Sequence, residues 1–212
     1  MEFLRTVIDV FLHLDVHLGN VISEYGPLTY ALLFLVIFCE TGLVVTPVLP
    51  GDSLLFAAGA FAGAGLLNLP VLLLLLFVAG VVGDAVNYLI GWYIGPRVFK
   101  ENGRFLNREK LLMAQRFYEK HGGKAIVLAR FMPFMRTLAP FVAGIGRMRY
   151  RDFAFYNLFG AFLWVGGIVT IGFLFGNIPE VKKNFEIVIL GIIFASLMPV
   201  LWHAVQEWRR SK

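Results

Sequence analysis

Residues 70–95 form an apolar stretch in which Asp84 is the only charged residue. A helix rises 1.5 Å per residue, so a stretch of this length can cross the roughly 30 Å hydrocarbon core of a bilayer. The composition agrees, because 58% of the 212 residues are hydrophobic and 16% are charged, whereas soluble domains carry about 25% charged residues. The sequence therefore predicts an all-α polytopic membrane protein with one membrane domain over residues 28–205.

Two further segments, residues 153–176 and 185–205, have the length and composition of membrane spans. Residues 1–25 instead repeat apolar side chains at helical spacing between charged ones, a pattern typical of an amphipathic helix lying in the membrane interface. These charges interrupt the apolar core that a cleaved signal peptide would need, so we expect the helix to be retained. Residues 206–212 form a basic tail.

Two other apolar segments are broken by prolines and charged residues, and they predict re-entrant hairpins from about residue 42 to 64 and from about residue 125 to 146. Non-helical backbone at membrane depth is tolerated only where protein or a watery cavity satisfies its polar groups. We therefore expect the hairpin tips to line a cavity. The predicted tip residues are Pro47, Pro50 and Gly51 in the first hairpin and Pro133 and Pro140 in the second.

Orientation follows from the basic residues, which favour the cytoplasmic side. Residues 96–124 hold eight Lys and Arg residues and include an amphipathic segment from about residue 107 to 121. If this loop is cytoplasmic, all other Lys and Arg residues outside the apolar segments lie inside too, except Lys182 and Lys183. Both termini are then predicted to be cytoplasmic.

The two halves of the chain predict an inverted repeat, because each has a broken hairpin followed by a glycine-rich span, and the two copies run in opposite directions. Inverted repeats whose broken helices meet near the midplane are a recurring transporter plan. Gly91 and Gly95 in the first span match Gly172 and Gly176 in the second. This small-residue spacing indicates close helix packing, and the sequence leaves open whether it occurs within one protomer or in a homo-oligomer.

Glu40, Asp52, Arg130 and Arg136 carry charge into the two hairpins. A charge at the bilayer centre costs at least about 2.5–3.5 kcal/mol, so mutual pairing, a wet cavity or both are expected. Guanidinium groups bind phosphate in a bidentate fork, and a carboxylate in a low-dielectric site can carry a proton. The alternative is structural: an acid neutralises Arg130 or Arg136 and joins the hairpins.

Other signals are weaker. Asp84 and Asn87 lie on one helix face, and we interpret them as secondary polar residues that cap loose backbone groups rather than bind an ion. The four histidines are scattered and no enzyme motif is evident, so the sequence predicts no enzymatic activity, no metal and no cofactor. The basic loop borders apolar spans, which favours lipid over nucleic acid as its partner.

Three stretches resemble the DedA family, also called the SNARE-associated or VTT-domain family: residues 38–56, which read Phe-Cys-Glu-Thr-Gly-Leu-Val-Val-Thr-Pro-Val-Leu-Pro-Gly-Asp-Ser-Leu-Leu-Phe, residues 83–88 and residues 129–144. The resemblance covers nearly the whole chain. It implies a bacterial inner-membrane protein tied to envelope homeostasis, the proton motive force and lipid translocation. The acids and arginines essential in that family map onto Glu40, Asp52, Arg130 and Arg136.

The function expected from these observations is a flippase- or scramblase-like transporter for lipids with a phosphate headgroup, such as polyprenyl phosphate or phosphatidylethanolamine. Arg130 and Arg136 would bind the phosphate, and Glu40 and Asp52 would exchange protons. One alternative is a proton-coupled antiporter of small cations or drugs, in which the acids bind the cation. Another is a non-transporting scaffold whose charges are structural.

Overall fold

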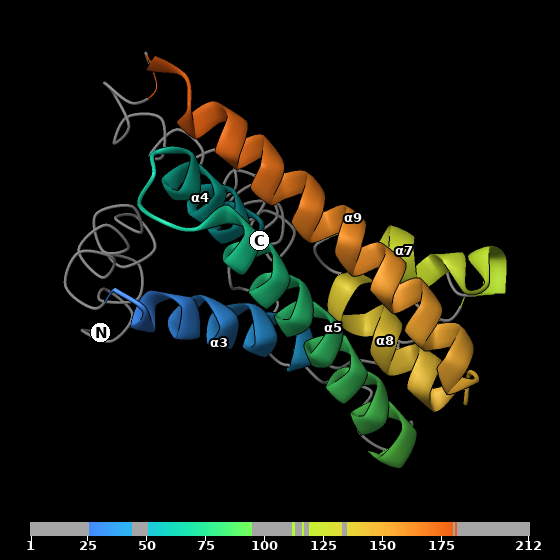
Figure 1. The fold of residues 1–212 in the computed structure, drawn as a ribbon. Helices are drawn as coiled ribbons and strands as arrows, with labels where there is room; N and C mark the ends of the chain where they lie inside the picture. Colours follow the sequence, from blue (N-terminus) through green and yellow to red (C-terminus); the bar gives the residue numbers. More distant parts are fainter. Residues whose placement is uncertain are drawn as a thin grey trace, which may run out of the picture. The chain divides into compact units, whose positions relative to one another are not determined.

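The computed structural model describes residues 26–43, 51–94, 119–132 and 135–179, together with Leu112, Arg116 and Val181. The elements in this part of the chain are all helices: α3 (Leu28–Gly42), α4 (Gly51–Gly63), α5 (Leu69–Ile94), α7 (Lys124–Ala129), α8 (Met135–Ile145) and α9 (Tyr150–Gly176) (Figure 1). The prediction of an all-α protein is confirmed for these residues.

Helices α5 and α9, with 26 and 27 residues, are long and apolar enough to cross a membrane. They match the spans predicted at residues 70–95 and 153–176, although α9 begins three residues earlier, at Tyr150. Helix α3 has 15 residues and is shorter than a full crossing. Several predictions lie outside the described residues: the interfacial helix 1–25, the tip residues Pro47, Pro50 and Pro133, most of the loop 96–124, the span 185–205 and the tail 206–212.

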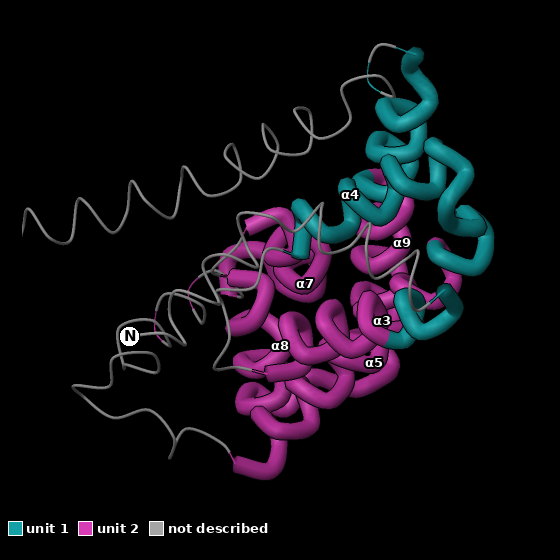
Figure 2. The backbone as a smooth tube through the Cα atoms, turned by 90° about the vertical axis from the view of Figure 1, so that its left-hand side faces the viewer, with its two compact units in different colours: residues 1–31, 50–72, 168–212 teal, residues 32–49, 73–167 magenta. Residues whose placement is uncertain are grey.

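The chain divides into two compact units (Figure 2). Unit 1 comprises residues 1–31, 50–72 and 168–212, and unit 2 comprises residues 32–49 and 73–167. The boundary between them falls within helices α3, α5 and α9.

In unit 1, α4 packs against the C-terminal part of α9 through glycine. A Cβ atom added to Gly59 would collide with the carbonyl oxygen of Val169, and one added to Gly172 would collide with that of Phe56. Gly63 and Gly176 repeat this arrangement one turn further along the two helices. Backbones this close leave no room for a side chain, which explains why small residues recur every four positions.

In unit 2, α8 packs against α5 in the same way. A Cβ atom on Gly91 would collide with the carbonyl oxygen of Phe141, and one on Gly144 with that of Tyr88. The sequence left open whether Gly91 and Gly172 pack within one protomer or between protomers. In the structure, both glycines make their close contacts within one chain.

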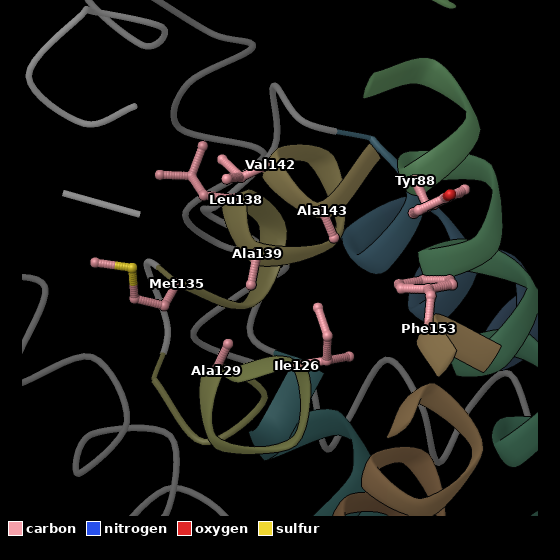
Figure 3. Packing of buried hydrophobic residues seen from close by; sticks show 9 residues of the cluster. All are labelled: Tyr88, Ile126, Ala129, Met135, Leu138, Ala139, Val142, Ala143 and Phe153. Carbon is pink, nitrogen blue, oxygen red and sulfur yellow. The ribbon is translucent and has the colours of Figure 1, made fainter. Parts of the chain in front are cut away.

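An apolar cluster supports this packing in unit 2, and its members come from α5, α7, α8 and α9 (Figure 3). At one side of the cluster, Tyr88 stacks on Phe153 with ring centroids 4.4 Å apart. The Tyr88 hydroxyl group donates a hydrogen bond to the carbonyl oxygen of Met148, which satisfies its polar end. The remaining members are Ile126, Ala129, Met135, Leu138, Ala139, Val142 and Ala143.

The segment of the second predicted hairpin holds two short helices, α7 and α8, with a break that begins at Arg130. Pro140, predicted at the hairpin tip, instead lies inside α8 and is buried. Proline has no N–H to donate to the carbonyl group four residues earlier, that of Arg136. Gly51, also predicted at a tip, is the first residue of α4.

Candidate functional site

The buried charged residues in the described part of the chain are Glu40, Asp84, Arg130 and Arg136, with exposed fractions of 4%, 0%, 1% and 5%. All belong to unit 2. Three were predicted as central site residues, and the fourth, Asp84, was predicted as secondary. Asp52 belongs to unit 1, where it is half-buried in the first turn of α4. A negative charge there complements the helix N-terminus.

Arg130 caps the C-terminus of α7 and directs its guanidinium group into the interior. Its Nη2 atom lies 2.6 Å from Asp84 Oδ2, 2.6 Å from Asn157 Oδ1 and 3.2 Å from the carbonyl oxygen of Gly80. This nitrogen carries two hydrogens, so three acceptors share two donors. The Nε and Nη1 atoms of Arg130 are buried and make no hydrogen bond with the described residues.

Two glycines make room for the Arg130 side chain. A Cβ atom on Gly160 of α9 would lie 3.0 Å from Arg130 Cδ, and one on Gly80 of α5 would lie 3.4 Å from Nη1. Because the first distance is shorter than ordinary packing allows, any larger residue at position 160 would displace the arginine. Gly80 and Gly160 together form what we call the arginine slot.

Arg136, in the first turn of α8, pairs with Glu40 of α3, and its Nη1 atom lies 3.2 Å from Glu40 Oε1. Both arginines lie over the ring of Trp164, with their Cζ atoms 5.6 Å (Arg130) and 4.7 Å (Arg136) from its centroid. The face of an indole ring attracts cations. Trp164 is fully buried and so forms a common platform for the two guanidinium groups.

Helices α3 and α5 cross beside this cluster. A Cβ atom on Gly83 would collide with Thr41 Oγ1, so the crossing needs a glycine at this point. Asn87, one turn further along α5, donates hydrogen bonds from Nδ2 to the carbonyl oxygens of Thr41 (3.1 Å) and Thr137 (2.8 Å). Thr41 lies in the last turn of α3, where carbonyl groups lack helical partners, so Asn87 joins α3, α5 and α8.

Among the described residues, Asp84 pairs with Arg130 through its Oδ2 atom and makes no hydrogen bond to a backbone group through Oδ1, unlike Asn87. Removing one partner of a buried ion pair costs about 3–5 kcal/mol, because the other charge is left uncompensated. The pairs Asp84–Arg130 and Glu40–Arg136 therefore hold α3, α5, α7 and α8 together at one point. They also concentrate two guanidinium groups there, which is the chemistry needed to bind an oxyanion.

Sequence reasoning missed Asn157, Gly160 and Trp164 on α9, and Gly80 on α5. A signal was present, because positions 157, 160 and 164 are spaced as one face of a helix. An asparagine in an apolar span also marks the side that faces protein rather than lipid. The Nδ2 atom of Asn157 in addition donates to the carbonyl oxygen of Val81, at 3.0 Å, which fixes α9 to α5.

The fold and the cluster define an α-helical membrane protein with a charged centre inside it. Residues 49–174 match the VTT domain family. Protein DedA of Escherichia coli strain K12 is 52% identical over 212 residues, which cover 99% of this chain and 97% of that protein. The chain therefore belongs to the DedA family of VTT-domain proteins.

Other relatives support a membrane location. A Mycobacterium leprae protein named only as an uncharacterized membrane protein is 44% identical over 180 residues, covering 83% of this chain and 81% of its own. The inner membrane protein YqjA of Escherichia coli strain K12 is 33% identical over 184 residues, covering 82% of this chain and 84% of its own. No solved structure matches the chain.

Proposed function

We propose that this protein is a flippase- or scramblase-like transporter of the bacterial inner membrane. It moves lipids with a phosphate headgroup, such as polyprenyl phosphate or phosphatidylethanolamine, between the leaflets and thereby supports envelope homeostasis. The observation that carries the proposal is the placement of Arg130 and Arg136 over one Trp164 ring inside an apolar helical protein.

The two arginines suit a phosphate for a geometric reason. Both guanidinium groups lie within cation–π distance of the same ring, and in the proposal one headgroup contacts both. Each guanidinium offers a planar fork of N–H donors that matches phosphate oxygens. The lipid tail needs no site of its own, because it can stay in the surrounding hydrocarbon while the headgroup crosses.

The acids supply a link to the proton motive force. A carboxylate that gains a proton loses its charge, which weakens its ion pair with an arginine. Protonation of Glu40 would therefore release Arg136 for phosphate. Asp52, predicted as a second proton carrier, retains that role in the proposal.

The packing of the two helix pairs supports an inverted repeat with re-entrant hairpins. In each repeat a hairpin helix precedes a span: α4 precedes α5, and α8 precedes α9. Each hairpin helix packs on the span of the other repeat, α4 on α9 and α8 on α5. In each contact, both helices contribute two residues: one whose carbonyl oxygen faces a glycine of the partner helix, and a glycine three positions later. Packing of each hairpin on the span of the other repeat is expected if two equivalent halves assemble around one axis.

Exchange of fluorescent phosphate-bearing lipids in proteoliposomes tests the proposed function. We expect wild type to accelerate exchange, and Arg136→Lys to lower the rate at least about tenfold, because lysine keeps the charge but loses the fork. Arg149→Ala, at an exposed arginine of unit 2, is the matched control and should behave as wild type. Absence of exchange by wild type would contradict the proposal, and cation-driven proton flux in its place would favour an antiporter.

A further inference from the structure

The buried charges of unit 2 balance one another. Glu40 and Asp84 contribute two negative charges, and Arg130 and Arg136 contribute two positive ones. The cluster is therefore neutral when both acids are ionised. Unpaired charge in a low-dielectric interior is expensive, so this neutral state is the favoured one without a ligand.

A phosphate group disturbs that balance. When an anionic phosphate enters, the buried site gains at least one uncompensated negative charge. Uptake of one proton by a carboxylate restores neutrality, and the carboxylic acid formed interacts less strongly with its arginine. The arginine can then pair with the phosphate in place of the acid. Binding of the phosphate and of the proton should therefore be coupled.

The geometry indicates which acid takes the proton. Asp84 binds Arg130 through Oδ2, while its Oδ1 atom, like Oε2 of Glu40, is buried and accepts no hydrogen bond from the described residues; what sets Asp84 apart is its arginine, whose Nη2 atom has two further acceptors. Oδ1 is thus a position where a proton can sit without displacing an existing donor. Nη2 of Arg130 would keep Asn157 Oδ1 and the Gly80 carbonyl oxygen as acceptors, which match its two hydrogens.

We propose that Asp84 takes up one proton when a phosphate headgroup binds to the arginine pair, so that Asp84, rather than Glu40 or Asp52 alone, couples lipid binding to protons. This inference rests on the proposed function and adds a proton-carrying residue to it. Arg130 at the end of α7 and Arg136 of α8 are the cations of the cluster, and α3 contributes Glu40, which is bound to Arg136. Helix α9 contributes the uncharged side chains of Asn157 and Trp164.

Proton uptake on binding of farnesyl phosphate tests this directly. The full chain in lipid nanodiscs is titrated calorimetrically in two buffers of different ionisation enthalpy, which gives the protons bound per ligand. We expect Asp84→Asn to take up about one proton fewer than wild type, because the amide keeps the shape but cannot titrate.

Asp152→Asn serves as the matched control, because Asp152 is an exposed acid in the first turn of α9. It should match wild type. Equal proton uptake by wild type and Asp84→Asn would overturn the inference and leave the proposed function intact, whereas absence of binding by wild type would overturn both. If Asp84→Asn does not fold, wild type decides with short-chain phosphatidylglycerol, whose phosphodiester carries one negative charge and does not titrate near neutral pH. Uptake of about one proton supports coupling, and no uptake contradicts it.

Discussion

At the scale of single residues, burial of the Arg130 side chain depends on neighbouring glycines, which have no side chain to fill the space. The side chain passes Gly160 and Gly80, and its guanidinium group meets Asp84 and Asn157. A long cationic side chain is rarely buried unless it is paired. Here the arginine slot supplies the space, and two acceptor side chains supply the hydrogen bonds.

Gly160→Ala should therefore disturb lipid exchange without a change of charge. The added Cβ atom would lie 3.0 Å from Arg130 Cδ, so the arginine must move by a few tenths of an ångström, which changes its position relative to Asp84 and Asn157. We expect exchange of a phosphate-bearing lipid to fall several-fold in proteoliposomes, since a misplacement of about 1 Å can cost far more than that in rate. Gly166→Ala, in the same helix with open space around it, should leave exchange unchanged, and equal effects of the two variants would contradict the slot.

The sequence predicted the residue types of the cluster better than their partners. Arg130, Arg136 and Glu40 stand out because charge in an apolar segment is costly. The structural alternative included a pair between Glu40 and Arg136, but the pair of Asp84 with Arg130 was not predicted, because these residues are 46 positions apart and meet only through tertiary packing. Asp84 looked secondary because its helix is otherwise a regular span, and a helix alone does not reveal which residue its one acid faces.

At the scale of helices, glycine contacts determine which elements pair. The spacing of Gly91 and Gly95, and of Gly172 and Gly176, predicts close packing, and the structure adds the partners, α8 for the first helix and α4 for the second. The partners could not be predicted because the spacing marks a face of one helix and carries no information about the other. Pro140 is a second example of information that the sequence does not carry. A proline predicts a break, whereas Pro140 lies inside the buried helix α8.

Gly172→Ala tests the pairing of α4 with α9. The methyl group would collide with the Phe56 carbonyl oxygen, so the two backbones must separate, and overpacking of this kind costs about 1–3 kcal/mol. We expect a lower thermal unfolding temperature in detergent. Gly167→Ala, in the same helix with nothing near its added methyl group, should be neutral or stabilising because alanine favours helix. A Gly172→Ala protein as stable as wild type would contradict the close contact.

At the scale of the whole molecule, the distribution of basic residues predicts how the protein lies in the bilayer. Residues 96–124 are expected in the cytoplasm, and Lys182 outside. The chain has a single cysteine, Cys39, which makes labelling straightforward. In a Cys39→Ser background, Lys120→Cys should react with an impermeant maleimide only in inside-out vesicles.

Lys182→Cys in the same background is the matched position and should react in intact spheroplasts. Labelling of both positions from the same side would contradict the predicted orientation. It would also remove the basis for an inverted repeat, because the two hairpins would no longer enter from opposite faces.

The measurement that tests the central claim most directly compares two lipids with the same tail, a polyprenyl phosphate and the corresponding polyprenol, in liposomes that contain the wild-type protein. If Arg130 and Arg136 recognise the phosphate, the protein will accelerate leaflet exchange of the polyprenyl phosphate and leave exchange of the polyprenol at the rate of protein-free liposomes. Equal acceleration of both lipids would mean that the buried arginines do not select the headgroup and would contradict the account.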